Sequence, residues 1–263
     1  MPPTDLAMQK DFYDKHSNFT GRTLMEYDLS PGTRAKFDAI LQRVKNRKFT
    51  TALDVGCSGN SFIHFLPFIT HKSFCDLAHI PLTQYSHYAR YHPTMGSITE
   101  MPFKDHSFEL ITALDVLEHI PNDESAASEI VRILQPNGIL VVTVPHRMKY
   151  FTPQDTICGH VRRYEYQQIR DLFTARGLKE LMVFPVYGQF MKIQFLQQAN
   201  PEKTEENLNK LRENYQRDPN FKKLWDKFVA IGSKCMKIDA RIQPFDKTMD
   251  ICLIFKKRKE TIN

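Results

Sequence analysis

Residues 52–61 of this chain read ALDVGCSGNS, a short apolar strand that runs into a turn of small residues, and a second apolar run follows at 62–68. Small residues in such a turn let backbone amides approach a ligand closely. The first strand-to-helix junction of an open α/β sheet is also where nucleotide-like cofactors bind. The stretch therefore predicts a cofactor site at the end of the first strand of an α/β fold.

From residue 51 onward, short apolar segments alternate with segments of helical periodicity. We expect strands at 51–55, 73–76, 109–114, 138–144, 179–185 and 250–255, and helices at 61–68, 81–91, 123–134 and 165–176. Such alternation predicts parallel strands joined by right-handed crossovers, in a sheet covered by helices on both faces.

The pattern changes at both ends of this region. Residues 1–47 are expected to form an N-terminal helical extension. Residues 186–248 separate the last two strands and read as a helical insertion, which we expect to act as a substrate cap. The alternating core is then expected at 48–185 and 249–258. We expect a minority of the following side chains to line the pocket and others among them to hold the insertion to the core: Tyr187, Phe190, Met191, Phe195, Phe221, Trp225 and Phe228.

Composition excludes several classes of protein. With 263 residues, 41% hydrophobic and 25% charged, the chain is expected to be a folded globular protein. Its apolar runs are shorter than the roughly 20 residues that span a bilayer, and its start does not resemble a secretory signal, so we expect a cytoplasmic protein. Five scattered cysteines without a CxxC pair indicate reduced thiols, with neither a disulfide framework nor a zinc site. Much of the net charge of +6 comes from basic runs such as 256–259, which favours a solvated surface.

Three further segments follow the turn in order. The first, 75–77, places Asp76 about twenty residues beyond the turn, where a carboxylate can accept hydrogen bonds from both ribose hydroxyls of an adenosine. The other two are 96–109, which begins GSITEMPF, and 114–119, which reads LDVLEH.

With these four segments the chain resembles the class I methyltransferases that use S-adenosylmethionine, particularly the methyltransferase type 11 group that includes quinone-biosynthesis methyltransferases. The family's LDVGCGTG-like turn, DLS-like acidic end, LPF-then-SFD run and VLEH segment appear in order, and the resemblance covers about residues 48–183. It implies a Rossmann-like sheet of seven strands in the order 3-2-1-4-5-7-6, helices on both faces, and S-adenosyl-L-methionine as cofactor.

The resemblance also implies roles for individual residues. The turn from Asp54 to Gly59 would cradle the methionine moiety, Asp76 would hold the ribose, and Leu77 and Ile98 would enclose the adenine. Ser58, Asn60 and Ser97 depart from the family, which usually has glycine at the first two positions and often aspartate at the third. The full set of expected cofactor-binding residues is Asp54, Gly56, Cys57, Ser58, Gly59, Asp76, Leu77, Ser97, Ile98 and Leu114.

A neutral hydroxyl acceptor needs a base, and ligands of open α/β sheets lie at the carboxyl edge of the strands. His146 and His160 follow strands there and are predicted to be catalytic, because an imidazole can accept a proton near neutral pH. Asp115 and His119, which follow the fourth strand, are also placed at this edge, and for His119 a packing role is favoured over a role as the base. Residues 162–164 (RRY) are expected either to bind an anionic acceptor or to form a surface patch at a helix start. No metal ion is expected.

The predicted function is methyl transfer from S-adenosylmethionine to a small-molecule, lipid-linked or glycan-linked acceptor, with oxygen favoured as the acceptor atom and carbon and nitrogen left open. Two alternatives stay open: a protein or RNA methyltransferase, and a cofactor-binding scaffold without turnover. Residues 114–117 (LDVL) differ from the (Asp/Asn)-Pro-Pro-aromatic motif of enzymes that methylate amino groups of bases. No RNA-binding appendage is recognisable, so neither DNA nor RNA is the expected partner. Peripheral contact of the amphipathic helices with a membrane stays open.

Overall fold

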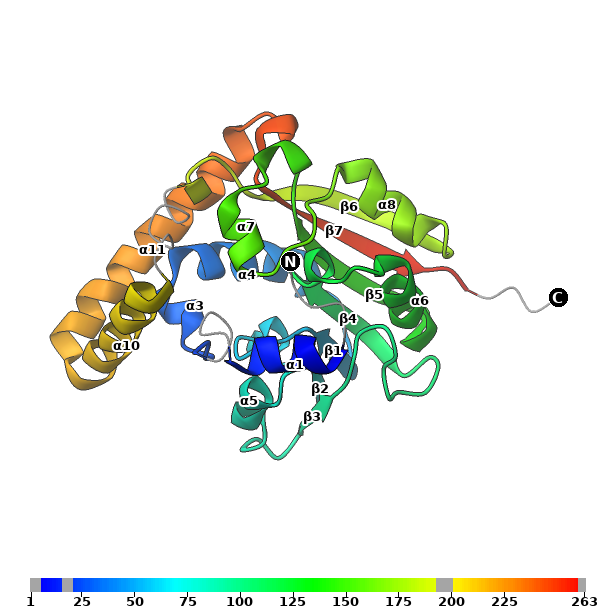
Figure 1. Ribbon diagram of the computed structural model, residues 1–263, viewed down its shortest axis with the longest axis horizontal. Coiled ribbons are helices and arrows are strands. Elements are labelled where there is room, and N and C mark those ends of the chain that lie inside the picture. Colours follow the sequence, from blue (N-terminus) through cyan, green and yellow to red (C-terminus); the bar gives the residue numbers. More distant parts are fainter. Residues whose placement is uncertain (1–5, 16–20, 193–200, 260–263) are drawn as a thin grey trace.

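The computed structural model describes residues 6–15, 21–192 and 201–259. Its centre is a seven-stranded sheet with the strand order β3-β2-β1-β4-β5-β7-β6 (Figure 1). The strands are β1 (Thr51–Val55), β2 (His71–Asp76), β3 (Tyr91–Met95), β4 (Phe108–Leu114), β5 (Leu134–Pro145), β6 (Leu178–Tyr187) and β7 (Asp250–Lys257). The first five are parallel, and β7 is antiparallel to both β5 and β6. The predicted fold class and strand order are confirmed.

The helices among the described residues are α1 (Leu6–Lys15), α3 (Glu26–Leu29), α4 (Pro31–Val44), α5 (His79–Leu82), α6 (Asp123–Ile133), α7 (Pro153–Ile157), α8 (Tyr166–Thr174), α10 (Pro201–Arg217) and α11 (Pro219–Ile242). Ser30 caps α4 by accepting a hydrogen bond from the Thr33 amide, and Pro31 is tolerated in the first turn. Among the described residues, none of these helices has the length and apolarity needed to cross a membrane.

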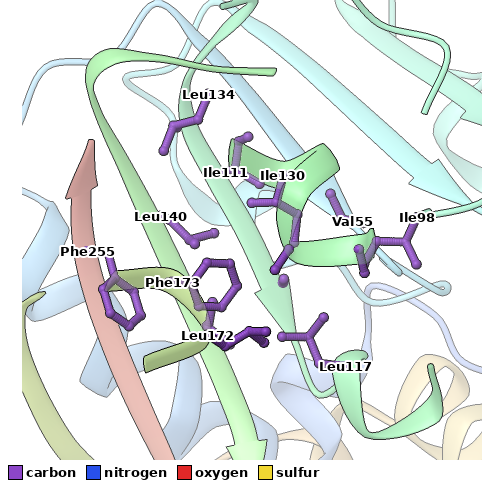
Figure 2. Packing of buried hydrophobic residues seen from close by; sticks show 14 of the residues in the cluster. Val55, Ile98, Ile111, Leu117, Ile130, Leu134, Leu140, Leu172, Phe173 and Phe255 are labelled. Carbon is purple, nitrogen blue, oxygen red and sulfur yellow. The ribbon is translucent and has the colours of Figure 1, made fainter. Parts of the chain in front are cut away.

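Each face of the sheet has its own hydrophobic core, because successive side chains of a strand point to opposite faces. On one face, α6 and α8 pack on strand residues such as Leu53, Ile111 and Leu140, as Figure 2 shows for part of this cluster. On the other face, α4 packs on the alternate strand residues, among them Ala52 and Leu110. The two cores hold the carboxyl ends of β1, β2 and β4 in fixed positions relative to one another.

Two expected helices are wrong. The expected helix at 81–91 is replaced by α5, a 3-10 turn (Thr83–Tyr85) and the strand β3. β3 was missed because it lies at the sheet edge, is only half-buried and contains Pro93, which a strand tolerates at an edge. The expected helix at 61–68 is only the 3-10 turn Phe62–Phe65, and Pro67 follows it.

The insertion forms a pair of helices, α10 and α11, beside α3 and α4 at the left of Figure 1. The Trp225 indole donates a hydrogen bond of 3.1 Å to the Leu29 carbonyl. Ion pairs of 2.6 and 2.7 Å join Arg212 to Glu26 and Lys237 to Asp38. The insertion is therefore helical, as expected, and it packs against the N-terminal extension.

Candidate active site

The turn after β1 has a backbone that requires small residues. Gly56 has a φ of +63°, and a Cβ added there would lie 2.3 Å from Cγ2 of Val116. Ser58 also adopts a left-handed conformation, with a φ of +45°, at a position where the family resemblance leads us to expect glycine. Such a backbone costs a residue with a side chain about 1 kcal/mol. The Ser58 amide donates a hydrogen bond to Asp76, and the Ser58 carbonyl accepts one from the Tyr85 hydroxyl. The conformation of the turn thus depends on the absence of a side chain at Gly56 and on the hydrogen bonds of Ser58.

Asp54 closes the base of this turn. Its carboxylate is buried and accepts hydrogen bonds from the hydroxyls of Ser61, at the far end of the turn, and Thr112 of β4. Burial raises the pKa of Asp54 to about 6, although these hydrogen bonds oppose the shift. Asp54 therefore joins β1, β4 and the turn into one unit.

Asp76 lies at the end of β2 and holds the other side of the turn. One carboxylate oxygen accepts a 2.8 Å hydrogen bond from the Ser58 amide, and the other accepts a 2.9 Å hydrogen bond from the Ala78 amide. Burial raises the pKa of Asp76, and the two amides counteract the shift. Each carboxylate oxygen can accept a further hydrogen bond, so the orientation suits a ligand with paired hydroxyls.

The remaining expected cofactor residues lie at the ends of β1, β2 and β4 and after β3. Cys57 and Ile98 are buried, whereas Leu77 and Leu114 are half-buried. The Ser97 hydroxyl makes a 2.8 Å hydrogen bond with the hydroxyl of Thr99. A Cβ added to Gly59 would lie 1.9 Å from the carbonyl oxygen of Arg22, so the N-terminal extension packs on the turn at this glycine.

A cluster of ionisable side chains follows β4. Oε1 of Glu118 lies 4.0 Å from Nε2 of His119 and 3.9 Å from Nε2 of His160. The two imidazole rings meet edge to face with centroids 4.6 Å apart. Burial raises the pKa of Glu118 well above its usual value and lowers that of His119 well below its own. We call Glu118, His119 and His160 the Glu–His–His cluster.

His160 is oriented by a carboxylate on α7. Nδ1 of His160 lies 2.8 Å from Oδ1 of Asp155, and Arg163 makes an ion pair with the same carboxylate at 2.8 Å. Burial would raise the pKa of Asp155, but His160 and Arg163 lower it to about 2. Because the ionised carboxylate only accepts hydrogen bonds, Nδ1 of His160 carries a proton, and Nε2 is the ring nitrogen that faces Glu118.

His146, the other predicted catalytic histidine, has different neighbours. Its side chain is buried, Nδ1 lies 2.9 Å from the Thr248 hydroxyl, and its ring packs against Phe245. Burial lowers its pKa to about 4. The structure thus brings His160 together with His119, for which only packing was expected, and places His146 against the turn before β7.

Residues 162–164 are engaged within the protein. Arg163 is buried with Asp155, and the Tyr164 hydroxyl donates a 2.8 Å hydrogen bond to Asp123, with the Leu117 carbonyl oxygen also within 3.2 Å. Arg162 pairs with Asp123 as well. Arg163 and Tyr164 therefore form neither an anion-binding site nor a surface patch. Both are buried, and they position α7 and the loop after β4.

A second ionic group, which we did not anticipate from the sequence, joins α4 to the sheet. The Lys36 ammonium pairs with Asp115, which also accepts a 2.5 Å hydrogen bond from the Thr143 hydroxyl. Burial alone would raise the pKa of Asp115, but Lys36 lowers it to about 2. Burial and the nearby Asp115 raise the pKa of Asp250 well above its usual value. Lys36 comes from the N-terminal extension, which therefore contributes to the carboxyl edge of the sheet.

The N-terminal helix α1 lies over this edge, next to α5 (Figure 1). Asp14 accepts hydrogen bonds of 2.8 and 3.2 Å from the amides of His79 and Ile80. The Tyr13 ring meets the His119 ring with centroids 5.9 Å apart. Burial raises the pKa of Tyr13, and Glu118 and Asp76 raise it further. Tyr13 therefore interacts electrostatically with both the Glu–His–His cluster and the Asp76 carboxylate at the end of β2.

Among the aromatic candidates for an acceptor pocket, several have the packing role that was expected for most of them. Phe221 and Trp225 of α11 stack on each other with centroids 5.7 Å apart, and the hydroxyl of Tyr187, at the end of β6, donates a hydrogen bond to the Gly32 carbonyl of α4. Phe190 and Phe228 are exposed. The expectation for Phe195 lies outside the described residues.

A seven-stranded sheet in this order, with a small-residue turn after β1 and a carboxylate at the end of β2, defines the class I methyltransferases that depend on S-adenosylmethionine. Residues 53–142 match the family described as Methyltransferase domain.

Three relatives illustrate the similarity. The chain is 29% identical over 141 residues to an uncharacterized protein of Methanocaldococcus jannaschii, covering 52% of this chain and 61% of that protein. It is 27% identical over 86 residues to a probable S-adenosylmethionine-dependent methyltransferase of Mycolicibacterium smegmatis, covering 32% and 34%. The chain thus spans less than two thirds of the length of either relative. A solved structure of Haemonchus contortus phosphoethanolamine N-methyltransferase 2 with S-adenosyl-L-methionine has a TM-score of 0.63, at 18% identity over 98% of this chain and 61% of that one, and shares the fold.

The residues present fit this cofactor. Asp76 is positioned to accept from paired hydroxyls, and Gly56 and Gly59 have no room for a side chain. Oδ1 of Asn60, in the turn, is buried and has no hydrogen-bond partner among the described residues, so it can accept from a donor on a ligand.

Proposed function

We propose that this protein transfers a methyl group from S-adenosylmethionine to a hydroxyl of a small-molecule, lipid-linked or glycan-linked acceptor. The observation that carries the proposal is the position of the Glu–His–His cluster. Val116, which packs on Gly56 of the cofactor turn, lies two residues before Glu118 in the chain. A cofactor held by the turn and an acceptor held at the cluster would therefore be neighbours.

S-adenosylmethionine, when bound, supplies a methyl group on a positively charged sulfur, which leaves as a neutral thioether with the electron pair of the broken carbon–sulfur bond. The chain's own contribution is to hold the acceptor in line and to assist the loss of its hydroxyl proton. His160 is the residue best suited to this second task, since Asp155 fixes its tautomer and directs Nε2 toward the cluster.

The environment of the cluster supports an oxygen acceptor. Burial lowers the pKa of His119 well below its usual value, so this imidazole is neutral near pH 7 and available as an acceptor of hydrogen bonds. A hydroxyl provides a hydrogen-bond donor for the neutral His119 imidazole and for the Glu118 carboxyl group. Tyr13 and the rest of α1 would cover the acceptor and exclude water.

Apolar surface next to α7 supports an acceptor with an apolar part. Phe151, Pro153 and Ile157 line a shallow depression on the outside of the same short helix that carries Asp155.

Methyl transfer from labelled cofactor to pooled phenols, isoprenoid phenols, sugars and amines tests the proposal. We expect label in a hydroxyl compound, and a decrease in kcat of about 10²-fold or more in His160→Gln with little change in cofactor affinity. His87→Ala is the control, since it removes an exposed imidazole. Label found only in amines would refute an oxygen acceptor. Tight cofactor binding without product from any pool would favour the scaffold alternative.

A further inference from the structure

We propose that Glu118, His119 and His160 bind a divalent transition-metal ion. One potential ligand atom from each of these residues lies within 4.8 Å of the other two. Metal–ligand bonds of about 2.0–2.2 Å place neighbouring ligand atoms about 3.0–3.5 Å apart. The distances of 3.9 and 4.0 Å from the Glu118 carboxylate to the two imidazoles therefore need to shorten by less than about 1 Å.

The burial of the Glu118 carboxylate is the observation that favours a bound cation. Its side chain is 1% exposed, and neither of its oxygens has a hydrogen-bond partner among the described residues. Leaving a buried carboxylate without hydrogen bonds is costly, and such groups are normally paired or bound to a metal. Arg163 donates hydrogen bonds to Asp155, and although its charge acts on Glu118 it donates no hydrogen bond to that carboxylate among the described residues.

His160 has the surroundings of a metal-binding histidine. A histidine that binds a metal through one ring nitrogen usually donates the other N–H to a carboxylate or a backbone carbonyl, which fixes the ring. Asp155 provides this carboxylate, 2.8 Å from Nδ1. Asp155 is itself held by the amide and hydroxyl of Thr152 and by Arg163. Nε2 of His160 is thereby oriented toward Glu118.

The donor set selects the kind of ion. Two imidazoles and one carboxylate suit Zn²⁺, Mn²⁺ or Fe²⁺, whereas Mg²⁺ and Ca²⁺ prefer ligand sets made only of oxygen. Three protein ligands leave at least one coordination position for water or another molecule. This site departs from our sequence-based expectation of no metal, because the adjacent pair Glu118-His119 and the distant His160 do not form a recognisable ligand spacing.

The role of the ion rests on the proposed function, methyl transfer to a hydroxyl group. An acceptor hydroxyl bound at the open position would have a lowered pKa and would lose its proton to solvent water, after which an oxygen lone pair forms the bond to the methyl carbon. The cluster would then act on the acceptor through the ion instead of as a free base.

Metal binding to the full chain, measured without cofactor or acceptor, tests the site directly. After removal of metal with a chelator, the protein is titrated with Zn²⁺ by calorimetry, and Co²⁺ is used as a spectroscopic substitute. We expect one ion per chain and a loss of affinity of about 100-fold in Glu118→Gln and His160→Gln, and about 10- to 100-fold in Asp155→Asn. His87→Ala, which alters an exposed histidine, is expected to bind as the unmodified protein does.

Two outcomes would overturn the site: no stoichiometric binding, or binding that Glu118→Gln and His160→Gln leave unchanged. If Glu118→Gln does not fold, His160→Gln and the Co²⁺ absorption spectrum of the unmodified protein decide, since a tetrahedral nitrogen–oxygen site and adventitious surface binding have different spectra.

Failure of the site and failure of the proposed function are distinguishable. Zn²⁺ binding that needs Glu118 and His160, without methyl transfer to any acceptor, supports the metal site and refutes the proposed function. Equal methyl transfer before and after chelation, with no stoichiometric metal binding, supports the function and overturns the metal site.

Discussion

Substitution of Asp76 by alanine is expected to abolish most cofactor binding at a small cost in stability. Its carboxylate accepts two backbone hydrogen bonds, from Ser58 and Ala78, and in the proposed site it would accept two more from ribose hydroxyls. A hydrogen bond to a charged group contributes about 1.5–3 kcal/mol, so loss of two corresponds to about 3–6 kcal/mol. Since 1.4 kcal/mol is a factor of ten, the Kd for S-adenosylmethionine should increase about 10²- to 10⁴-fold.

The chain offers a matched control for this substitution. Asp218 also accepts two backbone hydrogen bonds, from Asn220 and Phe221, but caps α11 in the insertion. Asp218→Ala should cost about 1 kcal/mol of stability and leave cofactor affinity unchanged. Calorimetric titration gives the Kd of both variants, and thermal unfolding without ligand gives their stability. Cofactor affinity within about threefold of the unmodified protein in a folded Asp76→Ala variant would refute the ribose assignment.

Three further predictions follow from other parts of the structure. Because burial lowers the pKa of His146 to about 4, the unfolded chain binds a proton between about pH 4 and 6.5 that the folded chain does not. The free energy of unfolding should therefore rise by about 1–3 kcal/mol as the pH increases through this window. Urea unfolding of His146→Gln at several pH values should lack this contribution. The same pH dependence in His146→Gln and in the unmodified protein would contradict the buried neutral state of His146. Asp155→Asn leaves the buried Arg163 charge unpaired and should lower the free energy of unfolding by about 3–5 kcal/mol. Adding Arg163→Met to this variant should recover part of the lost stability. A double variant no more stable than Asp155→Asn would show that the unpaired Arg163 charge does not cause the loss. Gly56→Ala should weaken cofactor binding. Adding Val116→Ala should restore only part of the affinity, because the second substitution relieves the 2.3 Å contact but not the positive φ of residue 56. Full restoration of affinity would mean that this backbone conformation is unimportant for binding.

The helical insertion shows where sequence reasoning about the acceptor was incomplete. Aromatic residues on an amphipathic helix can line a pocket or hold the helix to its neighbours, and periodicity alone does not separate the two. The contacts of Trp225 with Leu29 and Phe221 make it part of the junction between the insertion and the N-terminal extension. The role of the insertion as a substrate cap stays a prediction.

The sequence by itself determined the fold class and the class of cofactor. Both depend on local patterns: strands and helices in alternation, a turn whose glycines are required by its backbone, and Asp76 at the end of the next strand. These patterns are contiguous in the chain, so the physical constraints that produce them can be recognised in short segments.

Only the tertiary structure decided which side chains meet at the carboxyl edge of the sheet. Glu118 and His160 come from connections after different strands, and α7 adds Asp155 to orient His160. The N-terminal extension, predicted only as helical, places Tyr13 over the cluster and Lys36 against Asp115. Sequence spacing does not determine these contacts, because two hydrophobic cores on opposite faces of the sheet fix where each connection ends. The turn thus indicates the methyl donor, while packing decides which groups face the acceptor.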